Sequence, residues 1–430
     1  MINVRLNYAR SNDCSAWKHA YEPRKVYGQN AVDSQDRVDF QKLRKERLSK
    51  LQQSMKRENL EALLLFDGDN IRYATGLYDY GWRTYMRYCI VPVSSDPIMF
   101  DTVGTDLEFT SENASWLREN LEPAIVWKLA PADDVTMENR FAQGIIKALR
   151  KRGLKIDSCG SDIPDGMVIR SLSKVGIKVD DATDAVSKAR MIKSRDELEI
   201  LKMVCGFVDN AFWFAKNEFV KPGVRESQVK GKISQYLIGE CCCEAYVGNV
   251  STGGNTNPYY RGEHTDKVIR QGDLAILDIV ARYQGYWADF VRSWLVDATP
   301  TRKMREVYQQ CHDSLQQAMK AARPNSTTAD VARRLPTDKI AGVREETMKS
   351  SGLLNAGHGV GLTSHERPWI TRTYSLNHKE RIDPNMYFAI ETYVRRQDGI
   401  EAARLEENFV VTENGPITYS LFPFEDELLL

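Results

Sequence analysis

Residues 277–294 read LDIVARYQGYWADFVRSW, and this stretch places two aspartates, Asp278 and Asp289, inside an otherwise apolar pattern. The aspartates are eleven residues apart, with the pair Gly285-Tyr286 between them. Side chains alternate across a strand, so two strands joined by a hairpin loop would present both carboxylates on one face. The stretch therefore predicts a β-hairpin whose two acidic groups can bridge a pair of metal ions.

Three more ligating side chains lie in short apolar stretches downstream. His358 lies in NAGHGVGL, Glu391 in YFAIETYV and Glu406 in ARLEENFVV, all of which otherwise resemble core strands. An ionised carboxylate without a partner is costly to bury. A single buried aspartate or histidine often does no more than satisfy backbone groups. Five such side chains, each in a strand-like context, instead indicate bound cations.

The chemistry of these five side chains indicates which cations they would hold. Carboxylate oxygens with one imidazole suit Mn, Fe, Co or Zn. Two such divalent metal ions about 3.5–4 Å apart would activate a bridging water and polarise a carbonyl. Glu391 and Glu406 are fifteen residues apart and flank a turn centred on residues 397–399, QDG. We predict as metal ligands Asp278, Asp289, His358, Glu391 and Glu406.

Composition excludes several partners. The 59 basic residues balance 59 acidic ones, so no overall field attracts nucleic acid or an anionic membrane. The sequence contains no apolar window approaching the ~18–20 residues that a membrane span needs, and its first residues lack the apolar region of a secretory signal. Eight cysteines without CxxC spacing favour a reduced, cytoplasmic protein. Zinc binding by Cys241–Cys243 is disfavoured, because tetrahedral sites use spaced cysteine pairs.

The pattern along the chain predicts three parts. Residues 1–37 are polar and weakly periodic, and we interpret them as an N-terminal extension. Residues 38–185 alternate helical and strand patterns, which indicates an α/β domain. Residues 186–430 form the remaining domain. It begins with the strongest helical pattern of the chain, residues 194–219, and becomes rich in strands after Tyr246.

Individual elements can also be predicted. In the first domain, helices are expected at 38–58, 138–151 and 164–174, and strands at 62–67, 86–93 and 97–101. In the second, Ser194 and Glu197 have the spacing of a capping box at the start of the 194–219 helix. Two more helices are expected, at 302–323 and around 328–350.

The order Asp, Asp, HGxG, Glu, Glu resembles that of the pita-bread metallohydrolases, which include methionine aminopeptidase, prolidase, aminopeptidase P and creatinase. The resemblance rests on LD…GYWADFVRSW, GHGVGLTSHERP and ARLEENFVVTENG. It implies an α+β fold, with a pita-bread catalytic domain preceded by a creatinase-type α/β N-terminal domain. It implies the same five metal ligands, and His365 as a second histidine that contacts the substrate carbonyl. A homodimer is also expected from the family.

The sequence departs from the peptidase pattern around these ligands. Peptidases of the family carry a further histidine in a segment like NTxxPH, whereas this chain reads GGNTNPYYRGEH, with Tyr259 at about that position. The nearby His264 lies in a charged stretch. The usual glycine, threonine and proline beside the ligands are replaced by Val280, Val291 and Thr392. These departures leave the peptidase activity open.

A second resemblance is to the DddP-type dimethylsulfoniopropionate lyases, a non-peptidase branch of the same fold. LLLFDGDNIRYATG, STGGNTNPYY and the long N-terminal segment are similar to those enzymes. Two positions differ. Ile276 replaces an additional aspartate of the lyases, and Ser364 replaces the aspartate that removes the α-proton of the substrate, a role that serine cannot fill.

Three functions follow from these resemblances. The first is a metal-dependent hydrolase that cleaves a C–N bond in a dipeptide or small amide-like compound, with Glu391 transferring the proton and His365 stabilising the oxyanion. The second is a DddP-type lyase that cleaves dimethylsulfoniopropionate to dimethyl sulfide and acrylate, with Tyr259, His365 or a metal-bound hydroxide as the base. The third is a non-catalytic binding module of the same fold.

Aromatic and basic residues complete the predicted site. Trp82 and Tyr88 in the first domain and Tyr260 near the metals are predicted to contact the substrate, and aromatic faces attract cationic groups by about 0.5–2 kcal/mol. Core packing is the alternative interpretation for a ring such as Trp82. Arg404, two residues before Glu406, would bind a substrate carboxylate or pair with a ligand glutamate.

Overall fold

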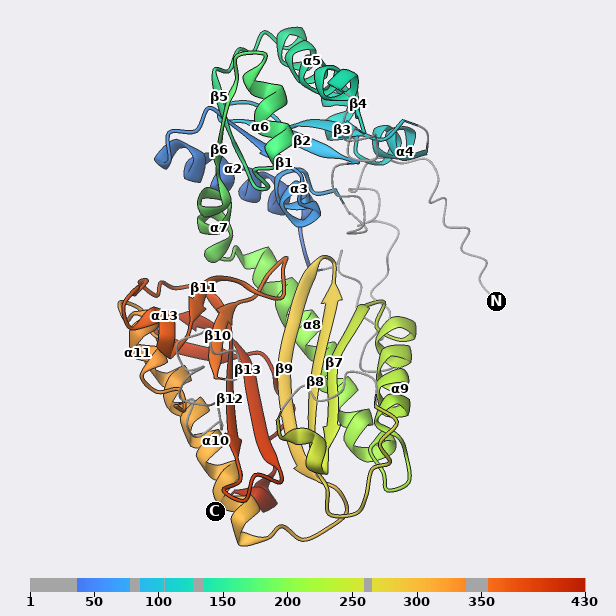
Figure 1. The fold of residues 1–430 in the computed structure, drawn as a ribbon, viewed down its shortest axis with the longest axis vertical. Helices are drawn as coiled ribbons and strands as arrows, with labels where there is room; N and C mark the ends of the chain where they lie inside the picture. The colour runs from blue at the N-terminus through green and yellow to red at the C-terminus, as the bar shows by residue number, and fades with distance from the viewer. Residues whose placement is uncertain are drawn as a thin grey trace. The chain divides into compact units, whose positions relative to one another are not determined.

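A computed structural model describes residues 37–77, 86–103, 105–126, 135–258, 265–337 and 355–429 of the chain. The chain divides into two compact units, and the second begins at Met191 (Figure 1). The predicted domain boundary, after residue 185, falls inside a helix that belongs to the first unit as far as Arg190. Apart from Arg37, the predicted N-terminal extension lies outside the described residues. No helix in the described ranges combines the length and apolar character that a membrane span requires.

The first unit is built on a mixed six-stranded sheet with the strand order β4-β3-β2-β1-β5-β6. β1 pairs antiparallel with β2 and parallel with β5, so the two kinds of ladder meet at this strand. The strands are β1 (Ala62–Leu65), β2 (Tyr88–Pro92), β3 (Ile98–Asp101), β4 (Leu121–Pro123), β5 (Ser158–Ser161) and β6 (Lys178–Asp181). The helices are α2 (Phe40–Arg57), α3 (Gly68–Thr75), α4 (Thr105–Asn113), α5 (Val135–Lys151), α6 (Gly166–Ser173) and α7 (Thr183–Met191).

Local signals determine most of these elements, and the predicted helices and strands of this unit are present within a few residues of the expected bounds. Asp39 caps α2 by accepting a hydrogen bond from Lys42 N at 3.0 Å. Asp67 caps α3 in the same way, by accepting from Asp69 N and Asn70 N.

Tyr88 lies in the core of the first unit. Its ring has no exposed area and stacks on Phe100 with the ring centroids 4.7 Å apart. Its hydroxyl accepts a hydrogen bond from Ile125 N at 3.1 Å, and burial raises the pKa of the phenol. This packing corrects the expectation that the Tyr88 ring contacts substrate. The sequence could not decide this, because an aromatic residue in an apolar strand suits core and pocket equally well.

The second unit begins with α8 (Arg195–Phe214), which continues as one π-helical turn, η3 (Ala215–Phe219). The predicted capping box is confirmed. Ser194 N donates to Glu197 Oε2 at 2.7 Å, and Glu197 N donates to Ser194 Oγ at 3.3 Å. The other helices are α9 (Glu226–Gly239), α10 (Arg302–Ala321), α11 (Thr328–Ala332) and α13 (Arg372–Ser375). Most of the helix expected around 328–350 lies outside the described residues.

Two sheets form the centre of this unit. The three-stranded sheet has the order β7-β8-β9, and its strands are β7 (Glu244–Thr252), β8 (Leu274–Tyr283) and β9 (Tyr286–Leu295). The five-stranded sheet has the order β11-β10-β12-β13-β14, and its strands are β10 (Ala356–Gly359), β11 (Glu366–Ile370), β12 (Tyr387–Arg395), β13 (Ala402–Thr412) and β14 (Gly415–Thr418). The mixed helix and sheet content confirms the predicted α+β class.

The predicted hairpin is formed by β8 and β9. Its two-residue turn is Gln284-Gly285, with φ of 49° and 84°, and positive φ at both turn residues matches the right-handed twist of a hairpin. Tyr286, expected in the loop, is instead the first residue of β9 and pairs with Tyr283. Val280 pairs directly with Asp289, so Asp278 and Asp289 lie diagonally on the same face, as predicted.

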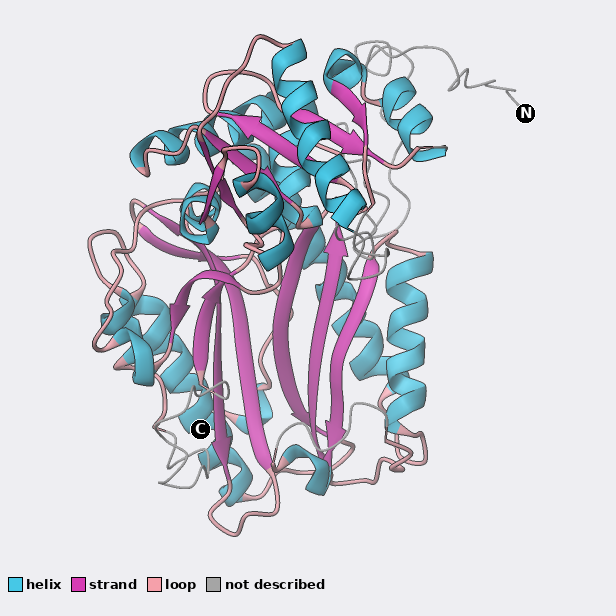
Figure 2. Ribbon diagram, turned by 45° about the horizontal axis from the view of Figure 1, so that its top comes forward, coloured by secondary structure: helices cyan, strands magenta, loops and turns pink. Residues whose placement is uncertain are grey.

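The two sheets meet edge to edge along β9 and β13, as Figures 1 and 2 show. Side chains take the place of a regular ladder there. Asp289 N donates to Asn408 Oδ1 at 3.0 Å, and Asn408 Nδ2 donates to Asp289 O at 2.7 Å. Further along, Ser293 Oγ donates to Arg404 O at 2.6 Å and accepts from Arg404 N at 3.2 Å. We call this line of contacts the seam.

Helices cover the sheets from outside. α8 packs on β8 and β9, α9 packs on β7, and α10 packs on β12 and β13. The main core of the unit lies between α10 and the five-stranded sheet, where Tyr308, Cys311 and Leu315 meet Phe388 and Leu405. The eight strands of the two sheets therefore form one joined layer, and the helices α8, α9 and α10 pack against it.

Candidate metal centre

The strand register places all five predicted ligands on one face of the joined sheets. The first row of cross-strand neighbours runs through Asn249, Asp278, Val291, Glu406, Glu391 and Ala356. The second row, two residues along, runs through Tyr246, Val280, Asp289, Asn408, Ala389 and His358. The seam contacts fix the step from β9 to β13 in both rows. Residues far apart in sequence thus become neighbours.

Four of the five predicted ligands belong to two groups whose ligand atoms lie close enough to hold a metal ion. Asp278, Asp289 and Glu406 each offer an oxygen, and these oxygens lie within 4.8 Å of one another. Asp289, His358 and His365 form a second group with the same spacing. Asp289 belongs to both groups, and His358 Nε2 lies 3.8 Å from Glu406 Oε1. This overlap suits a pair of ions that share a carboxylate.

The carboxylates of this face are buried and repel one another. Burial, followed by the charge of Asp278, raises the pKa of Asp289 well above its ordinary value. Burial, followed by the charges of Asp289 and Asp278, does the same for Glu406. Glu406 Oε1 is buried and has no hydrogen-bond partner within the described part of the chain. Divalent cations fit this donor set, because they would satisfy the buried oxygen and offset the repulsion.

His358 is held as a neutral ligand. Its Nδ1 lies 3.2 Å from Gly359 O, which fixes a proton on that nitrogen and leaves the lone pair of Nε2 directed at the carboxylates. Burial, followed by the nearby His365, lowers the pKa of His358 to about 3. A histidine that stays neutral at every ordinary pH is suited to a metal.

His365 lies against His358 at the open side of the site. The two rings stack with their centroids 4.1 Å apart and their planes 24° apart, and Trp369 lies beside both. Ser364 Oγ lies 3.0 Å from His365 Nδ1. Burial of the ring lowers the pKa of His365, although the residue keeps an exposed edge. The structure therefore brings His365 to the metal ligands.

Glu391 is engaged differently from the other ligands. It lies directly opposite Glu406, but its Oε2 is in contact with Nη2 of Arg404, and both side chains are buried. Of the two roles considered for Arg404, the structure contains the pairing with a ligand glutamate. Arg404 also lowers the pKa of both Asp289 and Glu406, although burial outweighs it in each case.

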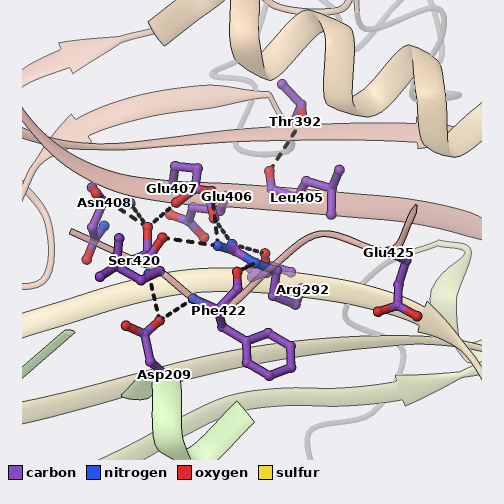
Figure 3. Close-up of polar contacts among 12 residues, drawn as sticks. Asp209, Arg292, Thr392, Leu405, Glu406, Glu407, Asn408, Ser420, Phe422 and Glu425 are labelled. Atoms are coloured by element: carbon purple, nitrogen blue, oxygen red, sulfur yellow. Dashed lines mark hydrogen bonds and ion pairs between the residues drawn. The ribbon is translucent and has the colours of Figure 1, made fainter. Parts of the chain in front are cut away.

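A second polar network lies behind the ligand strands and was not found from the sequence (Figure 3). Arg292, 1% exposed, donates from Nη1 to Glu406 O at 2.7 Å and from Nη2 to Glu407 Oε1 at 3.0 Å. Its Nε donates to Phe422 O at 2.8 Å. Asp209 Oδ1 accepts from Phe422 N at 2.7 Å. The network links the C-terminal segment to the backbone of the predicted ligand Glu406. The sequence signal for this network was the charged Arg292 in a predicted apolar strand.

The positions that depart from the peptidase pattern have structural roles where they are described. Val291 belongs to a small apolar cluster with Ile276, Tyr393 and Ala402. Thr392 Oγ1 donates to Cys311 O at 3.0 Å on the other face of β12. Val280 is half-buried beside Asp289. The predicted site residues Trp82, Tyr259 and Tyr260, together with His264, lie outside the described residues.

Comparison with known protein families agrees with this fold. Residues 199–413 match the family model "Metallopeptidase family M24", and residues 47–192 match "Creatinase/Prolidase N-terminal domain". The chain therefore belongs to metallopeptidase family M24, with a creatinase-type N-terminal domain ahead of a pita-bread catalytic domain, as predicted.

Individual relatives are prolidases and dipeptidases. The chain is 30% identical to the Xaa-Pro dipeptidase of Pyrococcus furiosus over 239 residues, which is 54% of this chain and 64% of the relative, just under two thirds of its length. It is 24% identical to the Xaa-Pro dipeptidase of Pyrococcus horikoshii over 377 residues, 86% of this chain and 95% of the relative. The crystal structure of dipeptidase PepE from Mycobacterium ulcerans has the same fold, with a TM-score of 0.68 at 22% identity over 90% of this chain and 98% of that one.

Proposed function

We propose that this chain is a dinuclear-metal-dependent hydrolase that cleaves the C–N bond of a dipeptide, in the manner of an Xaa-Pro dipeptidase. One observation carries the proposal. The register of two joined sheets gathers four carboxylates and His358 on one face with His365 close to them, and the buried carboxylates repel one another. The family membership and the names of the relatives support a dipeptide as substrate.

The residues that would hold the two ions are Asp278, Asp289, His358, Glu391 and Glu406. When bound, such ions supply a Lewis acid for the scissile carbonyl and lower the pKa of a water molecule. Asp289 belongs to both close groups of ligand atoms, so it is the residue best placed to serve both ions. Asn408 hydrogen-bonds both the backbone N and the backbone O of Asp289, which would help to orient the carboxylate.

His365 would stabilise the oxyanion. Its pKa is lowered by burial, so the ring is neutral near pH 7. With the Ser364 hydroxyl donating to Nδ1, Nε2 would carry the ring proton and would donate it as a hydrogen bond to the carbonyl oxygen. Ser364 itself is no base, which counts against the lyase.

Glu391 would transfer a proton from water to the leaving nitrogen. Its pairing with Arg404 fixes the position of the carboxylate beside Glu406. Arg404 is therefore a positioning residue for Glu391 in this proposal. Contacts of the substrate with Trp82, Tyr259 and Tyr260 remain predictions. A homodimer and a cytoplasmic location also remain predictions.

The proposal is tested by metal analysis together with a substrate screen. The purified protein is loaded separately with Mn²⁺, Fe²⁺, Co²⁺ and Zn²⁺, the bound metal is quantified, and each form is assayed on a panel of Xaa-Pro dipeptides and on dimethylsulfoniopropionate. We expect about two ions per chain and release of free proline. Asp289→Asn should lower activity roughly 100-fold or more, because even partners outside the ligand set cost 10- to 100-fold. Asp313→Asn, on the exposed face of α10, is the control.

Two other outcomes would overturn the dipeptidase. Release of dimethyl sulfide and acrylate would establish the DddP-type lyase, and Tyr259→His would then be expected to change the reaction. Absence of bound metal together with no effect of Asp289→Asn on any substrate would identify a non-catalytic binding module.

A further inference from the structure

The segment that carries His365 is not positioned by the sheet alone. Residues 360–366 join β10 to β11, and the pairing of these strands shifts register between His358 and Gly359. Within the segment, Gly361 N donates to Thr363 O at 3.1 Å, which closes a tight turn just before His365. Something outside the ladder must therefore set where the His365 ring lies.

Trp287 on the neighbouring sheet supplies two hydrogen bonds to this segment. Its backbone N donates to Gly361 O at 2.9 Å, and its indole Nε1 donates to Leu362 O at 2.9 Å. Trp287 lies in β9, two residues before Asp289. The same strand thus presents a predicted metal ligand and holds the segment of the second histidine.

The indole of Trp287 is itself fixed in place. The Tyr246 ring meets it edge-on with the centroids 5.3 Å apart, and the Arg282 guanidinium lies 5.6 Å from its centroid. Arg282 pairs directly with Trp287 across the β8–β9 hairpin and lies 3.7 Å from Glu244. These contacts hold the indole N–H in one direction. Its hydrogen bond to Leu362 O can therefore determine where the segment with His365 lies.

The far end of the segment is anchored as well. Glu366 forms a buried ion pair with Lys193, with side chains 7% and 1% exposed. Space around the glycines is restricted, since a Cβ at Gly361 would lie 2.5 Å from Glu366 Oε1 and one at Gly359 would lie 2.3 Å from Arg367 O. The segment is therefore fixed at both ends, with His365 between the two anchors.

We propose that Trp287 is a positioning residue that holds His365 in register with the metal ligands through the hydrogen bond from its indole Nε1. The inference rests on the proposed function, because it assigns His365 the contact with the substrate carbonyl. It also specifies how the aspartate hairpin and the histidine segment act as one unit. A small displacement of a catalytic group is enough to slow a reaction strongly.

The test is a double-mutant cycle that combines Trp287→Phe with His365→Ala. Phenylalanine keeps one aromatic ring against Tyr246 and Arg282 and removes the indole N–H together with the rest of the five-membered ring. We expect Trp287→Phe to lower kcat roughly tenfold, with KM and the number of bound metal ions unchanged. In the His365→Ala background, Trp287→Phe should have no further effect on kcat, because the residue that it positions is gone. Trp213→Phe, at an exposed tryptophan of α8, is the matched control.

A second readout does not depend on activity. The ring signals of the six histidines can be followed by NMR and the His365 signal assigned with His365→Ala. Trp287→Phe should shift the His365 signal and leave that of the distant His312 in place, whereas Trp213→Phe should shift neither. An equal loss of kcat in both backgrounds, or an unmoved His365 signal, would overturn the inference. If the protein cleaves no dipeptide but the His365 signal still moves, the proposed function fails and the positioning survives.

Discussion

Arg404 is the cation that the fold itself supplies to a strongly acidic site. Its side chain is 2% exposed and contacts Glu391, while its charge opposes the raised pKa of Asp289 and of Glu406. One guanidinium cannot balance four carboxylates on this face. Bound divalent cations would offset the repulsion that remains among these groups.

The loss of stability caused by replacing Arg404 should therefore depend on whether metal is bound. In metal-free protein we expect Arg404→Met to lower the free energy of unfolding by about 3–5 kcal/mol, because it leaves Glu391 buried without its partner. With saturating Mn²⁺ the loss should be much smaller, since the cation takes over the charge. Urea unfolding with EDTA and with Mn²⁺ measures both values. Arg302→Met, in an exposed pair with Glu306, should cost about 0–1 kcal/mol in either condition. A loss from Arg404→Met that is the same with and without metal would contradict this account.

Residues differ in how far the sequence reveals their roles. The five predicted ligands stand out because a charge in an apolar strand demands an explanation. The same signal was present at Arg292, but its partners are backbone carbonyls and Glu407, which no motif announces. Tyr88 was misassigned because a ring in an apolar strand suits a core and a pocket alike. Residue type identifies what needs a partner, and only the fold shows which partner it has.

At the scale of elements, the seam between β9 and β13 decides the geometry of the site. The strands of each sheet are held by backbone ladders, but the two sheets are joined there by side chains. Asn408, which has no exposed area, mimics a peptide group by both donating to and accepting from the backbone of Asp289. The two sheets could slide along this line if that pairing were absent, and Asp289 would then move away from Glu406.

Asn408→Ala should test the seam. It leaves the buried N–H and carbonyl of Asp289 without these partners, and each unsatisfied group costs about 1–3 kcal/mol. We expect a loss of about 2–4 kcal/mol in unfolding free energy and a weaker affinity for metal, measured by urea unfolding and by metal titration. Asn414→Ala, at an exposed turn, is the control. Unchanged metal affinity in a destabilised Asn408→Ala variant would show that the seam supports the fold but does not place the ligands.

Elements were predictable to the extent that their signals are local. Caps and apolar spacing lie within a few residues of each other, and α8 and α10 begin where the sequence indicated. The hairpin of Asp278 and Asp289 followed from alternation in the same way. The edge-to-edge joining of the sheets did not, because Asp289 and Asn408 are more than a hundred residues apart. The joining uses the side chains of Asn408, Ser293 and Arg292, which no local pattern in the sequence marks as links between sheets.

For the whole molecule, the balanced net charge allows the acidic site to dominate the pH dependence of stability. The net charge is zero and the isoelectric point is about 7.0, so overall repulsion changes little near neutral pH. Local shifts should therefore dominate. Burial raises the pKa of Asp289 and Glu406, and raises that of Glu407 to about 7. His358 is shifted in the opposite direction, to about 3.

The signs of these shifts determine the pH window. A carboxyl group whose folded pKa is raised binds more protons in the folded state, so its contribution to stability is complete below about pH 4 and is lost as pH rises to the folded pKa. His358 acts oppositely, because the unfolded ring takes up a proton below about pH 6.5. The two effects compete between about pH 4 and pH 6.5. Above that range only the carboxyl groups contribute a slope.

Metal-free protein should therefore lose stability as pH rises from 6.5 to 8, by about 1–3 kcal/mol in unfolding free energy if one or two carboxyl groups titrate. Saturating Mn²⁺ should reduce the fall to the part that Glu407 contributes, because a bound cation keeps Asp289 and Glu406 ionised at every pH in this range, whereas Glu407 pairs with Arg292 and is not a predicted ligand. Glu406→Gln in metal-free protein should reduce the slope, since it removes one titrating group and relieves the repulsion on Asp289. Urea unfolding at fixed ionic strength, with EDTA or with Mn²⁺, separates these cases. A stability that is flat or rising over this range in EDTA would mean that the carboxylates are already balanced by the protein, and that the site needs no metal to be stable.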